Sequence, residues 1–338
     1  MDRGNPMSRY ARQTILPEVG AKGQQALAAA HALVIGAGGL GSPVLPYLAG
    51  AGLGQITIVD PDVISLSNLH RQVLFREDQI GQSKAQVAAL TLRALNPDCQ
   101  INPVTVALTP ANAFDLVQSA DIVLDCADSF AVSYILSDTC LDLGKPLISA
   151  SALGFEGYVG GFCADSPSLR SLFPDLPDRA ASCDSAGVLG PVVGTIGAMQ
   201  AQMSLNTLLG LSPSPLGQMV TFDLHNLRTS GFRFDGAPEP EMPLTFIAPE
   251  AIAASDFVVE LRGLEEAPTP ITPSALRLTV DDLKTTRPTP GPGQRAVLTC
   301  RSGLRAWRAA RALQSYWTGD ITLIAMGDPA HSPKGTLK

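Results

Sequence analysis

The sequence lacks several features that would place it in a familiar class of protein. Its six cysteines are spread along 338 residues without a single Cys-x-x-Cys pair, and no secretory signal is recognisable. We therefore expect free thiols in the reducing cytoplasm. Basic residues are also scarce, because 24 Lys and Arg stand against 31 Asp and Glu and give a net charge of -7. This balance argues against a nucleic-acid or membrane-surface partner, since both call for a basic patch.

A long uninterrupted apolar run is missing too. Polar side chains break the most apolar long stretch, residues 190–211, at six positions: Thr195, Gln200, Gln202, Ser204, Asn206 and Thr207. Such a stretch is a poor transmembrane helix, so a buried helix is predicted there. The chain is longer than one average domain, and its length favours two.

Predicted strands alternate with predicted helices along the first part of the chain. The strands are expected at 32–35, 55–59, 100–106 and 147–151, and helices at about 83–95 and 131–143. A further buried strand is expected in the stretch ADIVLDCAD, before residue 128. This alternation predicts an α/β fold, a Rossmann-like and mainly parallel sheet with flanking helices.

Prolines concentrate after this first part. They indicate a linker over residues 236–249. Beyond it a second α/β pattern is expected, with strands at 256–261, 295–299 and 320–325 and a helix at 303–314. We predict a first domain over residues 1–235 and a small C-terminal α/β domain over residues 250–338.

A glycine fingerprint follows the first predicted strand. Gly36, Gly38 and Gly41 satisfy G-x-G-x-x-G, in which the missing side chains let the backbone approach a phosphate at a helix N-terminus. Asp60 ends the next strand, where a carboxylate can hydrogen-bond a ribose hydroxyl. On these residues alone, a nicotinamide dehydrogenase and a tight turn without a ligand both remain open.

The residues after Asp60 favour a nucleoside triphosphate. Asn68, Arg71, Gln72 and Lys84 follow in order, and cationic groups neutralise the charge that builds on a transferring phosphoryl group. Asp128 follows a buried strand, at the edge of the sheet where ligands bind, and could hold a magnesium ion.

Four motifs in this order carry a resemblance to a known family. GAGGLGS, then the aspartate with SNLHRQ, then GQSKA and then DCADSF resemble the ThiF/MoeB/HesA adenylyltransferases, relatives of ubiquitin-activating enzymes. The resemblance runs from about Ser8 to Asp235. It implies that ATP with Mg²⁺ activates the C-terminal glycine of a ubiquitin-like sulfur carrier ending in Gly-Gly. Thiamine synthesis, molybdopterin synthesis and tRNA thiolation are the pathways it implies, and the sequence does not choose among them.

The resemblance also implies roles for individual residues. Gly39 and Asp60 would hold the nucleotide with the segment from Ser67 to Arg71 and Gln72, Lys84 would bind the phosphates, and Asp128, beside Ser129, would bind magnesium. The opening segment SRYARQTILPEVG is similar to one whose second arginine, here Arg12, reaches the ATP of a neighbouring subunit. A homodimer with shared sites is therefore expected.

Two further features of the family can be compared with this chain. Cys183 stands where a relative often carries a cysteine that accepts the activated acyl group, although Asp184 beside it opposes formation of a thiolate. Many members also bind a structural zinc through two Cys-x-x-Cys pairs. Here Ser168 and Ser171 stand at the first pair and no second pair follows, so no zinc is expected.

The C-terminal part resembles a rhodanese-like sulfurtransferase domain. A strand ends in Glu260 and Arg262, a PSALRLT segment follows, and the loop Cys300-Arg301-Ser302-Gly303-Leu304-Arg305 has the form C-x-x-G-x-R. The resemblance implies that Cys300 carries sulfur as a persulfide, supplied by thiosulfate or a cysteine desulfurase. The part is short for such a domain, and Glu260 stands where an aspartate is common, so an inactive, vestigial tail is an alternative.

Two other classes of function stay open at this point. A dinucleotide-dependent oxidoreductase would leave Arg71, Lys84 and Asp128 without a purpose. A non-catalytic scaffold that binds only a carrier would not bind a nucleotide. We therefore expect an ATP-dependent adenylyltransferase with a sulfurtransferase tail.

Overall fold

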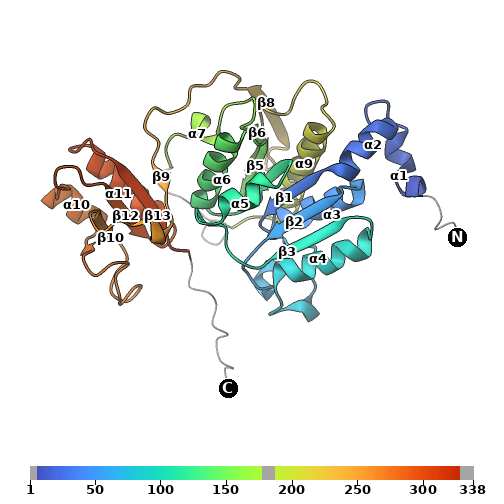
Figure 1. Ribbon diagram of the computed structural model, residues 1–338. Helices are drawn as coiled ribbons and strands as arrows, with labels where there is room; N and C mark the ends of the chain where they lie inside the picture. Colours follow the sequence, from blue (N-terminus) through green and yellow to red (C-terminus); the bar gives the residue numbers. More distant parts are fainter. Residues whose placement is uncertain (1–5, 177–186, 328–338) are drawn as a thin grey trace.

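A computed structural model describes residues 6–176 and 187–327 of the chain (Figure 1). Its first sheet has eight strands in the order β3-β2-β1-β4-β5-β6-β7-β8. The first five in this order pair in parallel, and the pairs from β5 to β8 are antiparallel. The strands are β1 (His31–Ile35), β2 (Gln55–Val59), β3 (Gln100–Val104), β4 (Ile122–Asp125), β5 (Leu147–Leu153), β6 (Glu156–Phe162), β7 (Gln218–Asp223) and β8 (Arg228–Arg233). The predicted α/β class and its parallel core are confirmed, whereas the antiparallel strands β6 to β8 were not predicted.

Helices cover both faces of this sheet. The helices described in this part of the chain are α1 (Pro6–Thr14), α2 (Gly20–Ala29), α3 (Gly41–Ala51), α4 (Lys84–Leu95), α5 (Ala113–Gln118), α6 (Phe130–Leu143), α7 (Leu169–Leu172) and α9 (Gly190–Leu208), with the short 3-10 helices η1 (Leu66–Asn68) and η2 (Glu77–Gln79). Residues of α3, α4 and α9 share one core with Ala32 and Val34, and residues of α5 and α6 share another with Leu33 and Ile35. Alternate side chains of β1 therefore point into opposite cores, as in a strand buried on both faces.

Local signals in the sequence set several of these boundaries. Ser83 caps α4, since its hydroxyl accepts the amide N–H of Gln86 at 3.5 Å. Gly144 ends α6 with φ of +61°, a conformation that glycine adopts at little cost. The predicted buried helix near residue 190 is α9, which packs on α3 and the sheet. Of the helices in the described ranges, none combines the length and apolar composition that crossing a membrane requires.

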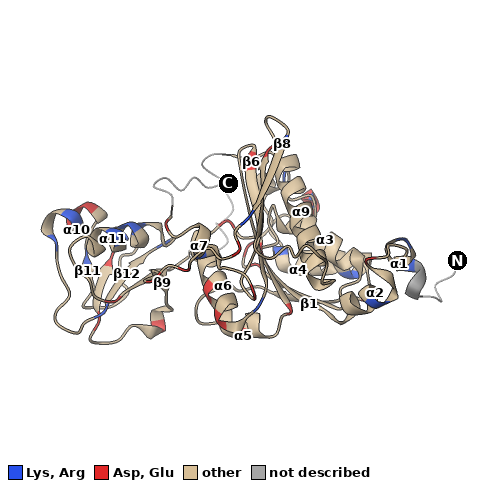
Figure 2. Ribbon diagram, turned by 90° about the horizontal axis from the view of Figure 1, so that it is seen from above, with Lys and Arg blue, Asp and Glu red and all other residues tan. Residues whose placement is uncertain are grey.

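The C-terminal part forms a second sheet, called here the tail sheet. Its five strands are parallel and lie in the order β11-β10-β12-β13-β9. The strands are β9 (Thr245–Phe246), β10 (Phe257–Glu260), β11 (Leu276–Arg277), β12 (Ala296–Cys300) and β13 (Ile321–Ala325), and the helices are η3 (Pro249–Ala251), α10 (Val280–Thr286) and α11 (Leu304–Gln314). Figures 1 and 2 show this sheet beside the first, on the side where α6 and α7 lie.

The proline-rich segment is more than a connection. It contains β9, which pairs with β13, and its Glu239 accepts hydrogen bonds from the amide and the hydroxyl of Ser168 at 2.7 and 2.6 Å. The prediction of a Pro-rich linker over residues 236–249 did not include this strand or the Glu239 contact. A strand of two residues at the edge of a sheet is compatible with nearby prolines, and its pattern is too short to predict a strand.

Candidate nucleotide site

The glycine loop between β1 and α3 is packed so closely that side chains are excluded. Gly36 has φ of +97°, and a Cβ added there would lie 2.7 Å from the carbonyl oxygen of Cys126. A Cβ at Gly41 would lie 2.1 Å from the carbonyl oxygen of Gly36, and one at Gly39 would lie 2.9 Å from Val193. At Gly38 the nearest atom, the amide nitrogen of Gln72, would lie at an ordinary 3.5 Å. The loop is thus held against β4 and α9 at the N-terminus of α3, where amide N–H groups favour an anion.

Asp60 closes this loop from the end of β2. One carboxylate oxygen accepts the amide N–H of Ala37 at 2.7 Å, and the other accepts that of Asp62 at 2.8 Å. Burial raises the pKa of Asp60, and Lys84 and the two amides offset part of that rise. A carboxylate accepts about four hydrogen bonds, so Asp60 can brace the loop and still accept a ribose hydroxyl.

Lys84 lies near this carboxylate and is almost buried. It is the first residue of α4, and its Nζ forms an ion pair of 2.8 Å with Asp62. The lysine side chain is 7% exposed and that of Asp62 is 60% exposed, so the pair opens to solvent on the side of the aspartate. Sequence reasoning missed Asp62, although the D-P-D pattern at 60–62 places a second carboxylate there. An incoming phosphate can replace Asp62 as the partner of Lys84.

A turn after β2 brings Arg71 and Gln72 to the glycine loop. The Asn68 carbonyl accepts the amide N–H groups of both residues at 3.0 Å, and the Ser67 carbonyl accepts from the Arg71 guanidinium at 3.1 Å. The Arg71 side chain would lie 3.9 Å from a Cβ at Gly39. Ser67 and Asn68 therefore shape the turn through their carbonyl groups.

Two buried polar atoms near the loop suit a bound ligand. The Oε1 of Gln72 and the hydroxyl of Ser42, in the first turn of α3, have no hydrogen-bond partner among the described residues. Both residues are at most 3% exposed. Because unpaired buried polar atoms are costly, these two atoms and the closely packed glycine loop fit a polar ligand such as a nucleotide.

Asp128 lies in the loop after β4, next to the glycine loop. β4 is the parallel neighbour of β1, and Cys126 contacts Gly36, so the two loops share the carboxyl edge of the sheet. Asp128 is exposed, and Ser129 occupies the cap position of α6. The described residues contain no cluster of three or more metal-ligating side chains. Mg²⁺ is commonly bound by one or two carboxylates and the substrate phosphates, and Asp128 fits that mode.

Asp125, which sequence reasoning did not single out, holds the loop that contains Asp128 through a hydrogen bond from the backbone of Ala127. Its carboxylate accepts hydrogen bonds from the amide of Ala127 at 3.2 Å and the hydroxyl of Ser149 at 2.9 Å. Burial raises its pKa to about 6, and the charge of Asp128 adds to the rise, while hydrogen bonds from Ser133, Ser149 and Ala127 oppose it. Asp125 is the first residue of D-C-A-D, and the sequence predicted only that the buried strand ends there in acidic residues.

Replacing Asp125 by Asn should remove a pH-dependent cost to stability. The folded state holds this proton more tightly than the unfolded state, so ionisation weakens the wild-type fold as the pH rises from about 4 to 7. We expect Asp125→Asn to gain about 2–3 kcal/mol of unfolding free energy relative to wild type over that range. Urea denaturation at several pH values measures the difference. A difference independent of pH would contradict the raised pKa.

Arg12 is not brought to the glycine loop of its own chain. It is exposed on α1, and Tyr10 of that helix contacts Gly52, which caps the C-terminus of α3. The glycine loop lies at the other end of this helix of 11 residues, roughly 16 Å away. Cys183 lies outside the described residues.

Cys300 lies in the tail sheet, at the end of β12. Its side chain is completely buried, and its Sγ accepts the amide N–H of Ala306, in the first turn of α11, at 3.3 Å. Arg305 pairs with Glu266 at 2.5 Å, and Arg262 pairs with the buried Glu260 at 2.6 Å. The pKa of Arg305 is raised by the hydrogen bond to Glu266 and also by the nearby Cys300 sulfur. The N-terminus of α11 thus lies against the sulfur, and two guanidinium groups, each paired with a glutamate, lie near it.

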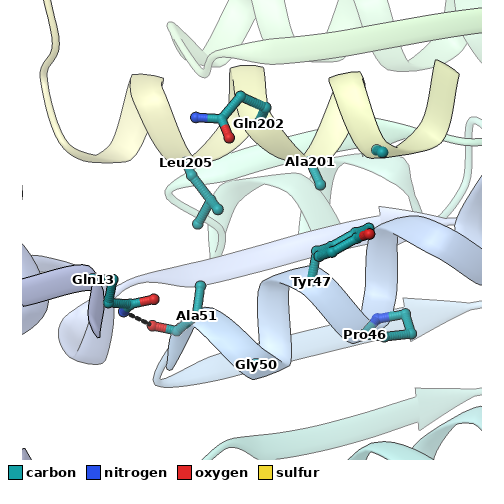
Figure 3. Close-up of a pocket in the computed structure, with 9 residues that line it drawn as sticks. Gln13, Pro46, Tyr47, Gly50, Ala51, Ala201, Gln202 and Leu205 are labelled. Atoms are coloured by element: carbon teal, nitrogen blue, oxygen red, sulfur yellow. Dashed lines mark hydrogen bonds between the residues drawn. The ribbon is translucent and has the colours of Figure 1, made fainter. Parts of the chain in front are cut away.

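A separate cavity of about 390 Å³ lies between α3 and α9, beside α1 (Figure 3). Its lining includes Pro46, Tyr47 and Leu205, and Gln13 donates a hydrogen bond to the carbonyl of Ala51 there at 2.7 Å. None of the described residues that line it is charged. A triphosphate needs cationic partners, so the uncharged lining of this cavity suits a triphosphate less well than the glycine loop does.

Replacing Gly41 by Ala should damage the nucleotide site, because the added Cβ would collide with the Gly36 backbone. Moving that backbone costs about 1–3 kcal/mol, which corresponds to roughly tenfold weaker ATP binding or more. Gly50→Ala is the matched control, since the same helix offers open space there. Calorimetric titration with ATP measures both variants. Equal affinity in the two would contradict the role of the close packing.

Comparisons with known proteins agree with this geometry. The model of the ThiF family matches residues 10–244. The protein named adenylyltransferase and sulfurtransferase MOCS3 of Bos taurus is 48% identical over 223 residues, which are 64% of this chain and 48% of the relative. Its namesake in Xenopus laevis is 43% identical over 237 residues, 68% of this chain and 52% of the relative. The chain therefore spans about half the length of the curated relatives it matches.

Solved structures share the fold over about two thirds or more of the chain. Escherichia coli MccB superposes with a TM-score of 0.61 at 21% identity, over 73% of this chain and 76% of MccB. Its complex with ATP gives 0.58 at 22% identity, over 68% and 72% of the two chains. The extent of the family match, together with the glycine loop, Asp60 and the cationic turn, shows that the chain belongs to the ThiF family.

Proposed function

We propose that the protein is an ATP-dependent adenylyltransferase for the C-terminal glycine of a ubiquitin-like sulfur carrier, with sulfur transfer through its tail. One observation carries this proposal. The glycine loop, Asp60, Lys84, Arg71 and the unpaired side-chain oxygen of Gln72 meet at one edge of the first sheet. The names of the MOCS3 relatives support both activities.

The residues at this edge act by binding and by stabilising charge. The loop amides at the start of α3 bind phosphate oxygens, Asp60 binds the ribose, and Arg71 and Lys84 neutralise the phosphates. The carrier carboxylate attacks the α-phosphorus, a P–O bond forms, the bond to the β-phosphate breaks, and pyrophosphate leaves. Asp128 would hold Mg²⁺, which when bound supplies further neutralisation of the phosphates. Positioning and electrostatics suffice for this step.

We also propose a homodimer in which Arg12 serves the site of the neighbouring chain. Its position beyond the far end of α3 supports this arrangement, because the arginine cannot serve its own glycine loop from there. Ile15 and Leu16, close to Arg12 in sequence, are 71% and 51% exposed and offer apolar surface for a contact between subunits.

The tail would supply the sulfur as a domain of its own, predicted over residues 250–338 and preceded by β9 of the same sheet. A parallel sheet whose strand β12 delivers Cys300 to a helix N-terminus supports a rhodanese-like assignment. The Cys300 thiolate attacks thiosulfate, an S–S bond forms, and sulfite leaves. The terminal sulfur of the persulfide attacks the carrier acyl-adenylate, a C–S bond forms, and AMP leaves. A dithiol reductant then provides two electrons, cleaves the S–S bond, and releases the carrier thiocarboxylate and the Cys300 thiol.

The complete burial of Cys300 favours a second candidate function. In this second candidate function, the site at the edge of the first sheet adenylates a carrier, and the tail transfers no sulfur. The two candidates share the first reaction and differ only in the fate of the acyl-adenylate.

Exchange of radioactive pyrophosphate into ATP tests the shared reaction. We expect exchange that depends on a carrier ending in Gly-Gly and on Mg²⁺, without turnover of a nicotinamide cofactor. Absence of exchange with several such carriers, or nicotinamide turnover, would reject adenylation. Failure to bind ATP would favour a non-catalytic scaffold that binds only a carrier over an adenylyltransferase.

A further inference from the structure

A buried polar network holds the segment where relatives of this family would carry the first zinc-binding pair. The Ser168 amide and hydroxyl donate to Glu239, and the same hydroxyl accepts the Arg170 amide N–H at 3.1 Å. Arg170 is 2% exposed and forms two hydrogen bonds with Asp138 of α6, at 2.5 and 2.8 Å. α7 is therefore fixed to α6 and to the segment that leads into the tail sheet.

The same arginine connects the two sheets. Its guanidinium lies 4.4 Å from the ring centre of Tyr134 on α6 and 5.8 Å from that of Trp307 on α11. The two aromatic rings stack on each other, with centres 5.3 Å apart and planes at 20°. Tyr134 also donates to the carbonyl of Phe173, just after α7, at 2.7 Å. We call Tyr134, Asp138, Arg170 and Trp307 the Arg170 joint.

Further contacts near the Arg170 joint connect α11 and the Cys300 loop to the segment after α7 and to α6. Arg311, one turn beyond Trp307 on α11, pairs with Asp175 after α7. A Cβ added at Gly303, in the Cys300 loop, would lie 2.8 Å from the Phe246 ring and 3.3 Å from Ala131 Cβ. Figure 2 shows α7 between the two sheets, next to α6. The loop that contains Cys300 thus packs against the first turn of α6.

This packing places Cys300 close to the nucleotide site of the same chain. Cys300 precedes Gly303 by three residues, and Asp128 precedes Ala131 by three residues. Three residues span at most roughly 11 Å, so the two α-carbons lie within about 30 Å. The extended C-terminal segment of a carrier covers that separation with about nine residues.

We propose that the Arg170 joint is a positioning device, which holds Cys300 and Asp128 of one chain within reach of a single carrier terminus. The inference rests on the proposed function and adds that adenylation and sulfur transfer occur in cis. Cation–π contacts and aromatic stacking make such a joint specific in geometry. The hydrogen bonds and ring contacts described above join its four side chains to one another and to Phe173, so we assign them a positioning role.

Trp307→Ala tests the joint from the tail side, with Trp317→Ala as the matched control. Three rates are compared: carrier-dependent exchange, thiosulfate-to-cyanide transfer, and thiocarboxylate formation on the carrier. We expect Trp307→Ala to slow only the third, by at least about tenfold, because small misplacements of a reacting group are costly. Trp317→Ala should leave all three unchanged. A normal third rate in Trp307→Ala would overturn the joint.

A double variant tests the joint on the side of the first sheet, at α6 and α7, in case Trp307→Ala unfolds the tail. Arg170→Met with Asp138→Asn removes both charges and leaves no buried ion unpaired. In a Trp317→Phe background, Trp307 is the only tryptophan, and its fluorescence reports whether the joint is closed. We expect a red-shifted emission and the same selective loss of thiocarboxylate formation. Unchanged emission and full transfer would overturn the proposal.

Coexpression of Asp128→Ala and Cys300→Ala chains tests transfer in cis. Each chain lacks one of the two functions, and mixed assemblies form whatever the number of subunits. We expect exchange and cyanide transfer to persist and thiocarboxylate formation to stay below about a tenth of wild type. Restoration to about a quarter, the value for random mixing in a dimer with one productive pair per mixed dimer, would show transfer between chains and overturn the cis arrangement. A wild-type protein without exchange or transfer would instead reject the proposed function, and the joint's role with it.

Discussion

Asp128→Ala should lower carrier-dependent ATP–pyrophosphate exchange by about 10²–10³-fold, the usual cost of removing a group that stabilises transition-state charge. Asp128 is exposed at the carboxyl edge of β4, beside the glycine loop that packs on Cys126. In the proposed mechanism Asp128 is the residue whose carboxylate binds the metal, whereas Asp60 binds the ribose. The loss should therefore appear in kcat more than in the affinity for ATP, because Asp60, Arg71 and Lys84 still bind the nucleotide.

Asp142→Ala is the matched control for this prediction. Asp142 is also exposed and lies on α6, but the length of the helix separates it from the nucleotide edge, at roughly 20 Å. Rates are measured by exchange at saturating carrier and varied Mg²⁺. A full rate in Asp128→Ala would remove its proposed magnesium role, whereas an equal loss in both variants would point to a general disturbance of α6.

The nucleotide loop was predictable because its constraints are local. Close packing excludes side chains at Gly36, Gly39 and Gly41, and such constraints appear directly as glycines at fixed spacing. Asp60 follows from the alternation of strand and helix, which places the end of β2 beside the loop. The partner of Lys84 was not predicted, because Asp62 approaches it only when the turn after β2 meets the start of α4.

The arrangement of the tail against the first sheet was not predictable from periodicity. Arg311 and Asp175 are 136 residues apart in sequence, and Arg170 meets Trp307 across a similar separation. Patterns of apolar residues identify α11 and its buried face, but they do not identify the surface that this face meets. The two serines at 168 and 171 were recognised only as a departure from cysteine, and their neighbours show how the segment is held.

Cys300→Ala should abolish thiosulfate-dependent formation of the carrier thiocarboxylate and leave ATP–pyrophosphate exchange unchanged. The sulfur of Cys300 accepts the amide N–H of Ala306 at the start of α11, close to Arg262 and Arg305. Exchange depends on the other sheet and should not respond. Mass spectrometry of the carrier distinguishes the thiocarboxylate from the unreacted carboxylate, and the exchange rate of the same preparation shows that the first sheet is folded.

Cys99→Ala is the matched control, since burial raises the pKa of that thiol to about 11. Burial also raises the pKa of Cys163 to about 12 and those of Cys126 and Cys140 well above the ordinary value. These four thiols therefore stay protonated near pH 7 and are poor nucleophiles. Equal thiocarboxylate formation by Cys300→Ala and wild type would establish the adenylyltransferase with an inactive tail.

Because Cys300 is fully buried, an active tail further requires the loop of residues 301–303 to open. Iodoacetamide should then label Cys300 faster once thiosulfate or carrier displaces that loop, and Cys99 should stay protected.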